Sequence, residues 1–147
     1  MPFYLVYTSL PRKEMSRDVL EEITQSSLKN NRANAISGIL LGIESRYLQY
    51  LEGEKEKVLD LFHKIKMDGR HHGVTKWVEG TTDSRVFGDW SMASWMLSST
   101  ELSKLPAVQE MNAFLKKAKD NAASSAKFIE MMKNLLDSWI DHQNEKK

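Results

Sequence analysis

Apolar and polar positions along residues 3–97 predict short strands alternating with two amphipathic helices. Runs of apolar, aromatic and branched residues indicate strands, whereas apolar positions at i, i+3, i+4 and i+7 indicate helices. In chain order the expected elements are strand 3–9, helix 16–31, strand 35–43, strand 47–51, helix 54–68, strand 74–80 and strand 90–97.

Local signals set the expected ends of these elements. Ser16 can cap the first helix, and the asparagines at 30–31 end it. The residues at 52–54, Glu-Gly-Glu, are typical of a turn after the strand 47–51. Two glycines bracket a loop over 69–73.

The order of these elements predicts the fold class. Strand, helix, strand, strand, helix, strand is the order of an α+β ferredoxin-like sandwich, in which two helices cover one face of a sheet. The additional strand 90–97 gives the order βαββαββ and a five-stranded mixed sheet. Beyond it the pattern indicates only two helices, 106–118 and 122–143. We therefore expect a domain at 1–97 and a helical extension at 98–147.

The composition excludes several classes of function. The 147 residues carry 21 Lys and Arg against 20 Asp and Glu, so no charged footprint for nucleic acid or a membrane is expected. The chain has no cysteine, which excludes disulfides, thiolate nucleophiles, zinc–cysteine sites and flavin photochemistry through a cysteinyl adduct. No signal peptide or long apolar run occurs, so we expect a cytoplasmic protein.

Gln49 stands in the middle of a predicted buried strand, where its amide needs hydrogen-bond partners. A buried donor or acceptor left unpaired costs about 1–3 kcal/mol. If both strands alternate strictly, Tyr7 and Gln49 point to the same face of the sheet, under the helices. Asn31 lies where the first helix ends. The three side chains can line a crevice without a strong acid or base, which suits a planar hydrogen-bonding heterocycle better than bond cleavage.

The same residues carry a resemblance over residues 1–97. The motifs, in chain order, are Tyr7 with Ser9, NN at 30–31 before SGILL, Gln49 ahead of LEGE, DGRHH at 68–72 and FGDWSM at 87–92. Each motif alone is weak, but their order and spacing form a specific set. The chain resembles the BLUF family of blue-light sensors using flavin, in its short single-domain form with carboxy-terminal helices.

The resemblance implies a flavin between the two helices, FAD with FMN as the alternative. Tyr7 would be the photochemical electron and proton donor, and Gln49 would bridge it to flavin N5 and O4. The residues implied to hold the flavin are Asn31 at the O4/N3 edge, Lys29 near the ribityl phosphate, Asp68 in the loop, Arg70 toward O2, His71 along the ring, and Ser9. For signalling, the implied residues are Trp90, Ser91 and Met92, with either Trp90 or Met92 beside Gln49.

The resemblance implies a photoreceptor, and because residues 98–147 are too few for a cyclase, phosphodiesterase or DNA-binding module, we expect no catalytic output domain. Light would rearrange the hydrogen bonds of Gln49, and the change would leave through the strand 90–97. We expect output by contact with a downstream effector protein, through the helices after residue 98 or the exposed sheet face, together with assembly into a homo-oligomer. The alternative for these helices, given equal weight, is that they only cap the sheet.

Simpler interpretations stay open for each residue taken singly. Tyr7 can be a core residue, Gln49 a satisfied strand amide and Asn31 a helix end cap. The histidines at 71–72 have no further ligand at metal spacing, so no metal is expected. Two rival functions share the fold: a regulatory ligand-binding or interaction module, and an acylphosphatase-like hydrolase, for which Arg12 lacks the glycines of a phosphate cradle.

Overall fold

The computed structural model describes residues 1–11, 16–43, 46–69, 71–88, 91–97, 104–117 and 125–145. Two compact units follow each other along the chain, Met1–Met96 and Leu97–Lys147. All candidate site residues that the structure describes belong to the first unit.

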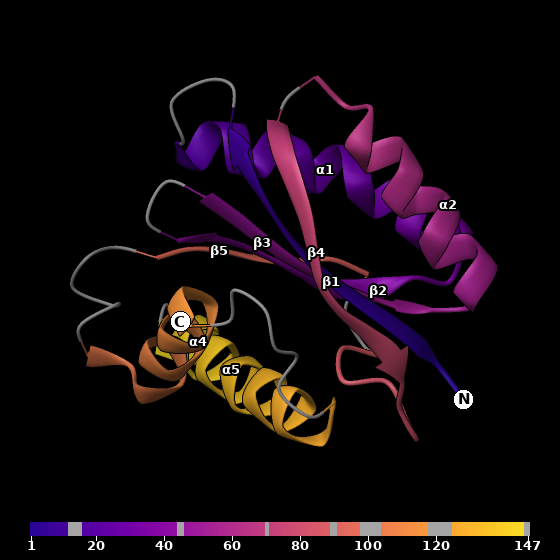
Figure 1. Ribbon diagram of the computed structural model, residues 1–147. Coiled ribbons are helices and arrows are strands. Elements are labelled where there is room, and N and C mark those ends of the chain that lie inside the picture. Colours follow the sequence, from indigo (N-terminus) through magenta and orange to yellow (C-terminus); the bar gives the residue numbers. More distant parts are fainter. Residues whose placement is uncertain are drawn as a thin grey trace. The chain divides into compact units, whose positions relative to one another are not determined.

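A five-stranded mixed sheet forms the frame of the first unit (Figure 1). Its strands are β1 (Phe3–Pro11), β2 (Ser37–Ile43), β3 (Arg46–Gly53), β4 (His71–Thr81) and β5 (Ala93–Met96). Their spatial order is β4-β1-β3-β2-β5. β5 lies parallel to β2, and the other neighbours are antiparallel. The expected α+β ferredoxin-like fold is therefore confirmed.

Two helices, α1 (Arg17–Ala33) and α2 (Lys55–Lys66), cover one face of this sheet (Figure 1). Ser16 caps α1 as expected, because its hydroxyl accepts a hydrogen bond from the Val19 backbone N–H at 3.2 Å. Apolar residues of the helices and of alternate strand positions form one core cluster, which includes Phe3, Leu5, Tyr7, Leu20, Leu40, Leu51, Val58, Phe62 and Met92. The period of two in the strands thus decides which residues face the helices.

Three expected boundaries were wrong. β4 begins at His71, so three of the five residues of the expected loop 69–73 belong to a strand, where Gly73 adopts a φ of +60°. Glu52 and Gly53 are the last residues of β3 rather than a turn, and Glu52 is fully buried. β5 covers only Ala93–Met96, because Ser91 and Met92 precede the pairing with β2.

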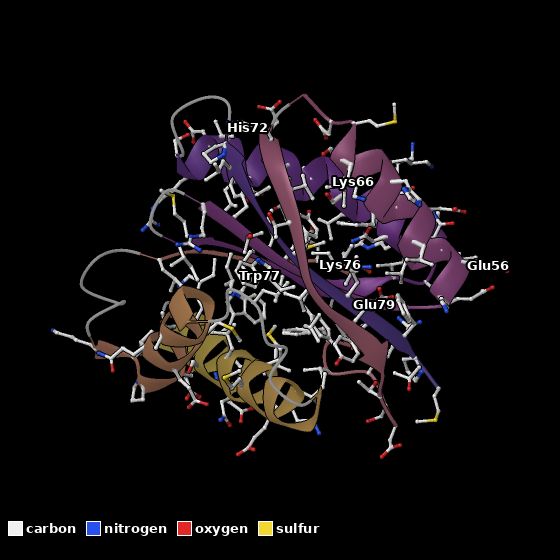
Figure 2. The ribbon with its side chains drawn as sticks, in the orientation of Figure 1. Glu56, Lys66, His72, Lys76, Trp77 and Glu79 are labelled. Atoms are coloured by element: carbon white, nitrogen blue, oxygen red, sulfur yellow. The ribbon has the colours of Figure 1, made fainter. Side chains whose placement is uncertain are left out.

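β4 is an edge strand of the sheet, and its outer positions carry charge. Lys76 and Glu79 are exposed and form an ion pair there (Figure 2). Charged side chains on an edge strand oppose pairing with another chain. This pair of charges thus protects the edge.

The second unit contains α4 (Pro106–Lys117) and α5 (Ser125–Glu145), which contact each other. Pro106 occupies the first helical position as expected. Among the described residues of this unit, the buried hydrophobic side chains are Leu97, Val108, Met111, Met131, Met132, Leu135 and Trp139. The two expected carboxy-terminal helices are thus confirmed. Within the described residues, no helix could cross a lipid bilayer.

We predict that Gly38→Ala lowers the free energy of unfolding by about 1–3 kcal/mol in urea titrations. A Cβ at Gly38 would lie 2.0 Å from the Tyr50 carbonyl oxygen, so paired strands β2 and β3 must move apart. Gly69→Ala is the matched control, since its Cβ would meet no atom within 4 Å. An equal loss in both variants would contradict the packing argument.

Candidate functional site

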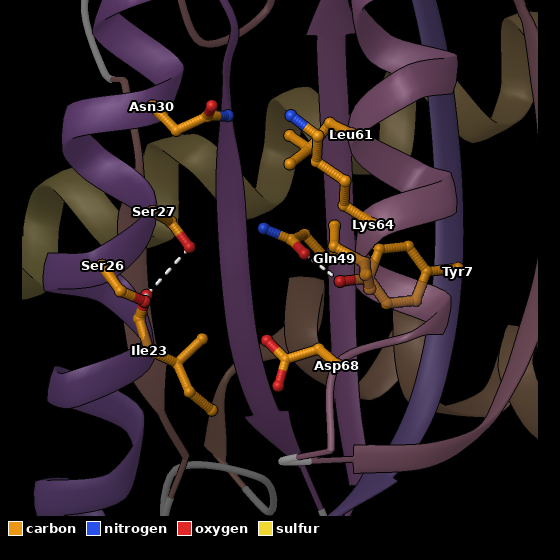
Figure 3. A pocket seen from close by; sticks show the side chains of 10 residues that line it. Tyr7, Ile23, Ser26, Ser27, Asn30, Gln49, Leu61, Lys64 and Asp68 are labelled. Atoms are coloured by element: carbon orange, nitrogen blue, oxygen red, sulfur yellow. Dashed lines mark hydrogen bonds between the residues drawn. The ribbon is translucent and has the colours of Figure 1, made fainter.

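Pairing of β1 with β3 places Tyr7 directly opposite Gln49. Both side chains are buried, and the Tyr7 hydroxyl donates a hydrogen bond to Gln49 Oε1 (Figure 3). The Phe62 ring of α2 packs against the Tyr7 ring with centroids 5.4 Å apart. The sheet register and the packing of α2 therefore hold the phenol and the amide in hydrogen-bonding contact.

The other end of the Gln49 amide has a weaker partner. Its Nε2 lies 3.5 Å from the sulfur of Met92, and a thioether is a weak acceptor. A primary amide has two N–H donors, so Gln49 keeps donor capacity toward the pocket that it lines. The amide is thus firmly fixed on its oxygen side and loosely fixed on its nitrogen side.

A cavity of about 170 Å³ opens between α1 and α2, above this pair (Figure 3). Its lining residues are Tyr7, Ile23, Ser26, Ser27, Asn30, Gln49, Leu61, Lys64, Ile65 and Asp68. The aliphatic side chains offer apolar contact, and the amides, hydroxyls and charged groups offer hydrogen bonds. Such a lining suits a planar heterocycle with polar edges.

Burial raises the pKa of the Tyr7 phenol above its ordinary value of 10.0, and the charge of Asp68 raises that pKa further. The phenol therefore stays protonated at physiological pH and acts as a hydrogen-bond donor. Among the described residues, no group of His, Cys, Asp and Glu is arranged to hold a metal ion.

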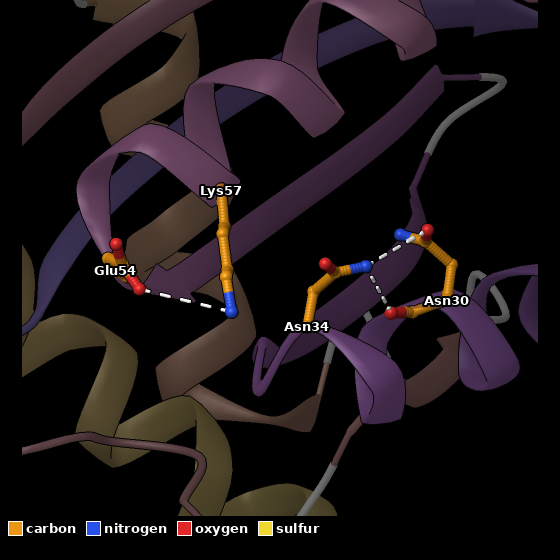
Figure 4. Close-up of polar contacts among 4 residues, drawn as sticks. All are labelled: Asn30, Asn34, Glu54 and Lys57. Carbon is orange, nitrogen blue, oxygen red and sulfur yellow. Dashed lines mark hydrogen bonds and ion pairs between the residues drawn. The ribbon is translucent and has the colours of Figure 1, made fainter.

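Two neighbouring asparagines at the end of α1 have different surroundings: Asn30 lines the cavity, and Asn31 is hydrogen-bonded to Ser91. Asn31 is fully buried, and its Nδ2 donates to the Ser91 carbonyl at 2.8 Å. Asn31 Oδ1 is buried with no hydrogen-bond partner among the described residues. Asn30 lines the cavity, and its carbonyl and Oδ1 accept from Asn34 Nδ2 at 2.9 and 3.2 Å (Figure 4). The Nδ2 donor of Asn30 is thereby left for the cavity.

The remaining sequence-predicted residues divide into three groups. Asp68 lines the cavity together with Tyr7 and Gln49. Lys29 is exposed and Ser9 is buried, and neither lines the cavity. Arg70 and Trp90 lie outside the described residues, as does the side chain of His71.

Sequence reasoning missed the full set of helix positions that line the cavity. On α1 these are residues 23, 26, 27 and 30, and on α2 and just beyond it residues 61, 64, 65 and 68. Both sets follow the i, i+3, i+4, i+7 spacing of one helix face. Extending this spacing from Asn30 and Asp68 would have found Ser26 and Lys64.

Fold and site together define a ferredoxin-like ligand-binding domain with a buried phenol–amide pair beneath its pocket. Residues 3–93 match the family model described as sensors of blue-light using FAD, the BLUF family. The chain belongs to this family and is a blue-light-sensing domain that binds flavin.

Several known proteins are similar to this chain. Photoactivated adenylate cyclase subunit beta of Euglena gracilis is 30% identical over 115 residues, which cover 78% of this chain and 13% of that protein. Blue light- and temperature-regulated antirepressor BluF of Escherichia coli (strain K12) is 30% identical over 88 residues, 60% of this chain and 22% of that protein. The chain therefore spans a small part of these curated relatives.

A solved structure with the same fold has about the same length as this chain. The dark-state structure of BlrB, a BLUF protein, has a TM-score of 0.73 at 24% identity and covers 93% of this chain and 96% of its own. The likeness therefore extends over almost the whole length of both chains.

The residues present in the site fit a flavin. Ile23, Leu61 and Ile65 supply apolar surface for the ring, while Asn30 and Gln49 direct amide donors into the cavity. Asn31, which follows Asn30 in the chain but is not among the lining residues, has a buried Oδ1 with no hydrogen-bond partner among the described residues. A heterocycle with carbonyl oxygens and a ring N–H offers the complementary groups.

We predict that wild-type protein loses stability above about pH 10 more steeply than Tyr7→Phe. The folded-state pKa of Tyr7 is raised, so the stability that this group contributes is complete below the unfolded pKa and declines as pH rises toward the folded pKa. The two slopes should differ by up to about 1.4 kcal/mol per pH unit in urea titrations between about pH 9 and pH 11. Parallel slopes would contradict a buried, protonated phenol.

Proposed function

We propose that Tyr7 and Gln49 are the photochemical pair of this blue-light sensor, with the flavin held between α1 and α2. The observation that carries the proposal is the buried hydrogen bond from Tyr7 to Gln49 at the floor of the cavity. It joins an oxidisable phenol to an amide whose nitrogen lines the cavity and lies 3.5 Å from a thioether, a weak acceptor. The pair needs no base, nucleophile or metal ion.

Several residues would hold the flavin. Asn31 and Asn30 would meet its polar edge, and Lys64 and Asp68 would approach it from α2 and the following loop. Arg70, His71, Ser9 and Lys29 keep the roles implied by family resemblance, as predictions. We propose FAD as the flavin, since the family model is described by that cofactor.

The chemistry of the pair follows from its geometry. When bound, a flavin supplies absorption of blue light and, once excited, a strong oxidant. The phenolic proton of Tyr7 lies on the hydrogen bond to Gln49 Oε1, so loss of an electron from the ring can be coupled to proton movement along that bond. When the electron and the proton return to Tyr7, the Gln49 amide can be left rotated or tautomerised. Either change exchanges its donor and its acceptor without backbone motion.

We predict that Gln49→Leu keeps its yellow colour and loses the light-induced red shift of the flavin absorption. The substitution removes the group whose polarity must change and keeps a side chain of similar size. Absorption spectra before and after blue light measure the effect. Gln25→Leu, on the exposed face of α1, is the matched control and should shift normally.

Tyr7→Phe forms the second arm of the same experiment. This variant keeps the ring that packs against Phe62 and removes the hydroxyl. It should bind flavin and show no red shift. A normal shift in either site variant would refute the assignment of the pair, whereas colourless wild-type protein that takes up no flavin would refute the binding site.

We further propose that the domain has no catalytic output and acts by contact with an effector protein, as a homo-oligomer. One similar protein is named an antirepressor, which supports output through protein contact. Others are cyclase subunits, so a different output module remains the competing proposal. A cytoplasmic location stays a prediction. The division of the chain into a photosensory domain at 1–97 and a helical extension at 98–147 also stays a prediction.

The output proposal predicts that deleting residues 98–147 keeps the flavin red shift but abolishes light-dependent binding of the effector. The sheet and both pocket helices lie before this segment. A light-versus-dark pull-down with full-length and shortened protein measures binding, and the absorption shift is the control for an intact pocket. Light-dependent binding by the shortened protein would contradict output through the carboxy-terminal helices.

The two rival functions are not favoured. A hydrolase of the acylphosphatase type would rest on Arg12, which lies outside the described residues, and family membership gives it no support. A plain ligand-binding module leaves the contact between the phenol and the amide without a role. Illumination separates that module from a photosensor.

A further inference from the structure

Glu52 is a fully buried carboxylate on the sheet face opposite to the Tyr7–Gln49 pair. Its Oε1 accepts hydrogen bonds from the Val86 N–H at 2.7 Å and the Tyr50 hydroxyl at 3.0 Å. Its Oε2 accepts from the Phe87 N–H at 2.6 Å and the Ser37 hydroxyl at 2.8 Å. Four donors from three separate segments therefore converge on one side chain.

Two of these donors come from a connection that contains neither helix nor strand. Residues 82–88 follow β4 in irregular conformation, and Glu52 binds two consecutive backbone N–H groups there. Arg85 Nη1 also donates to the Ser37 hydroxyl at 3.1 Å, and the buried Phe87 ring packs on Tyr50 with centroids 5.4 Å apart. The connection is thus fastened to β2 and β3 by its backbone and its side chains.

The same connection leads directly to the photochemical pair. Ser91 accepts from Asn31 Nδ2, and Met92 places its sulfur 3.5 Å from Gln49 Nε2. The chain from Phe87 to Ser91 spans at most about 14 Å when fully extended. The point fixed by Glu52 is therefore only a few residues before Met92, the residue that contacts Gln49.

Both oxygens of the Glu52 side chain must act as hydrogen-bond acceptors. Backbone N–H groups can only donate, and each oxygen receives one of them. In Glu52→Gln one oxygen becomes an NH₂ group that faces a backbone donor in either amide orientation. Burial also raises the pKa of the Tyr50 phenol, and the charge of Glu52 raises it further, so this phenol stays a donor.

We propose that Glu52 is a positioning residue for the light reaction: by binding the backbone of residues 86–87, it fixes the register in which Met92 meets Gln49. The proposal rests on the proposed function of the Tyr7–Gln49 pair. Glu52 touches neither of them, and it acts through the connection and Met92. It thereby sets how firmly the nitrogen side of the Gln49 amide is held.

A double-mutant cycle on the full-length flavin-bound protein tests this coupling. In the wild-type background, we expect Glu52→Gln to change the rate constant of dark recovery at least about 3-fold. In a Met92→Ala background, the same substitution should change this rate constant by less than about 1.5-fold. Glu54→Gln is the matched control, because Glu54 is exposed and pairs only loosely with Lys57, at 3.9 Å (Figure 4). Equal effects of Glu52→Gln in both backgrounds, or no effect in either, would overturn the proposal.

Hydrogen exchange in the dark separates this role from the light function. The amides of Val86 and Phe87 should exchange at least about 10-fold faster in Glu52→Gln than in wild-type protein or Glu54→Gln. If Glu52→Gln does not fold, hydrogen exchange in wild-type protein is the test. The amides of Val86 and Phe87 should be protected at least about 100-fold over free peptide, and unprotected amides would overturn the proposal that Glu52 holds them. A wild-type protein without any light response contradicts the proposed function and leaves the exchange result intact.

Discussion

The hydrogen bond between Tyr7 and Gln49 is the interaction on which the rest of the site depends. Antiparallel pairing of β1 with β3, which are both interior strands of the sheet, fixes the two residues opposite each other, and burial leaves their polar atoms few partners. The phenol stays protonated, so Gln49 Oε1 has a defined donor. The Nε2 group meets a sulfur, which accepts weakly. One half of the amide is therefore determined by the fold, and the other half by whatever occupies the cavity.

The difference between the two ends of the Gln49 amide explains how a small change in its hydrogen bonding can act as a signal. A single hydrogen bond contributes about 1 kcal/mol net, which alters a two-state population only several-fold. A useful switch must therefore be nearly balanced before the signal arrives. Gln49 meets this condition because rotation of its amide exchanges groups of nearly equal shape and opposite polarity. Met92 is in direct contact with the amide and immediately precedes β5, so a change of polarity reaches a strand end at once.

Local sequence patterns predicted the parts of the fold that local physics decides. Period-two alternation placed Tyr7 and Gln49 on one face, and Ser16 marked the start of α1 correctly. The pairing of Asn31 with Ser91 and the entry of Lys64 into the cavity depend on how the helices lie over the sheet. Glu52 was mistaken for a turn residue because a charge followed by glycine resembles one. Two of its four partners, the N–H groups of Val86 and Phe87, come from more than thirty residues further along the chain, where no local pattern reveals them.

β3 thus presents two kinds of polar group, one on each face. Gln49 carries a donor and an acceptor of similar shape, so its environment decides its orientation. Glu52 carries two acceptors and meets four donors, so it has one satisfied arrangement. A switch needs both properties, because an ambivalent group transmits information only if the neighbours that read its polarity keep their places. The fixed carboxylate holds the connection that brings Met92 to the amide, and the amide remains free to change. In the proposed light reaction, the separation of these tasks across one strand lets the amide change while the residue that reads its polarity stays in place.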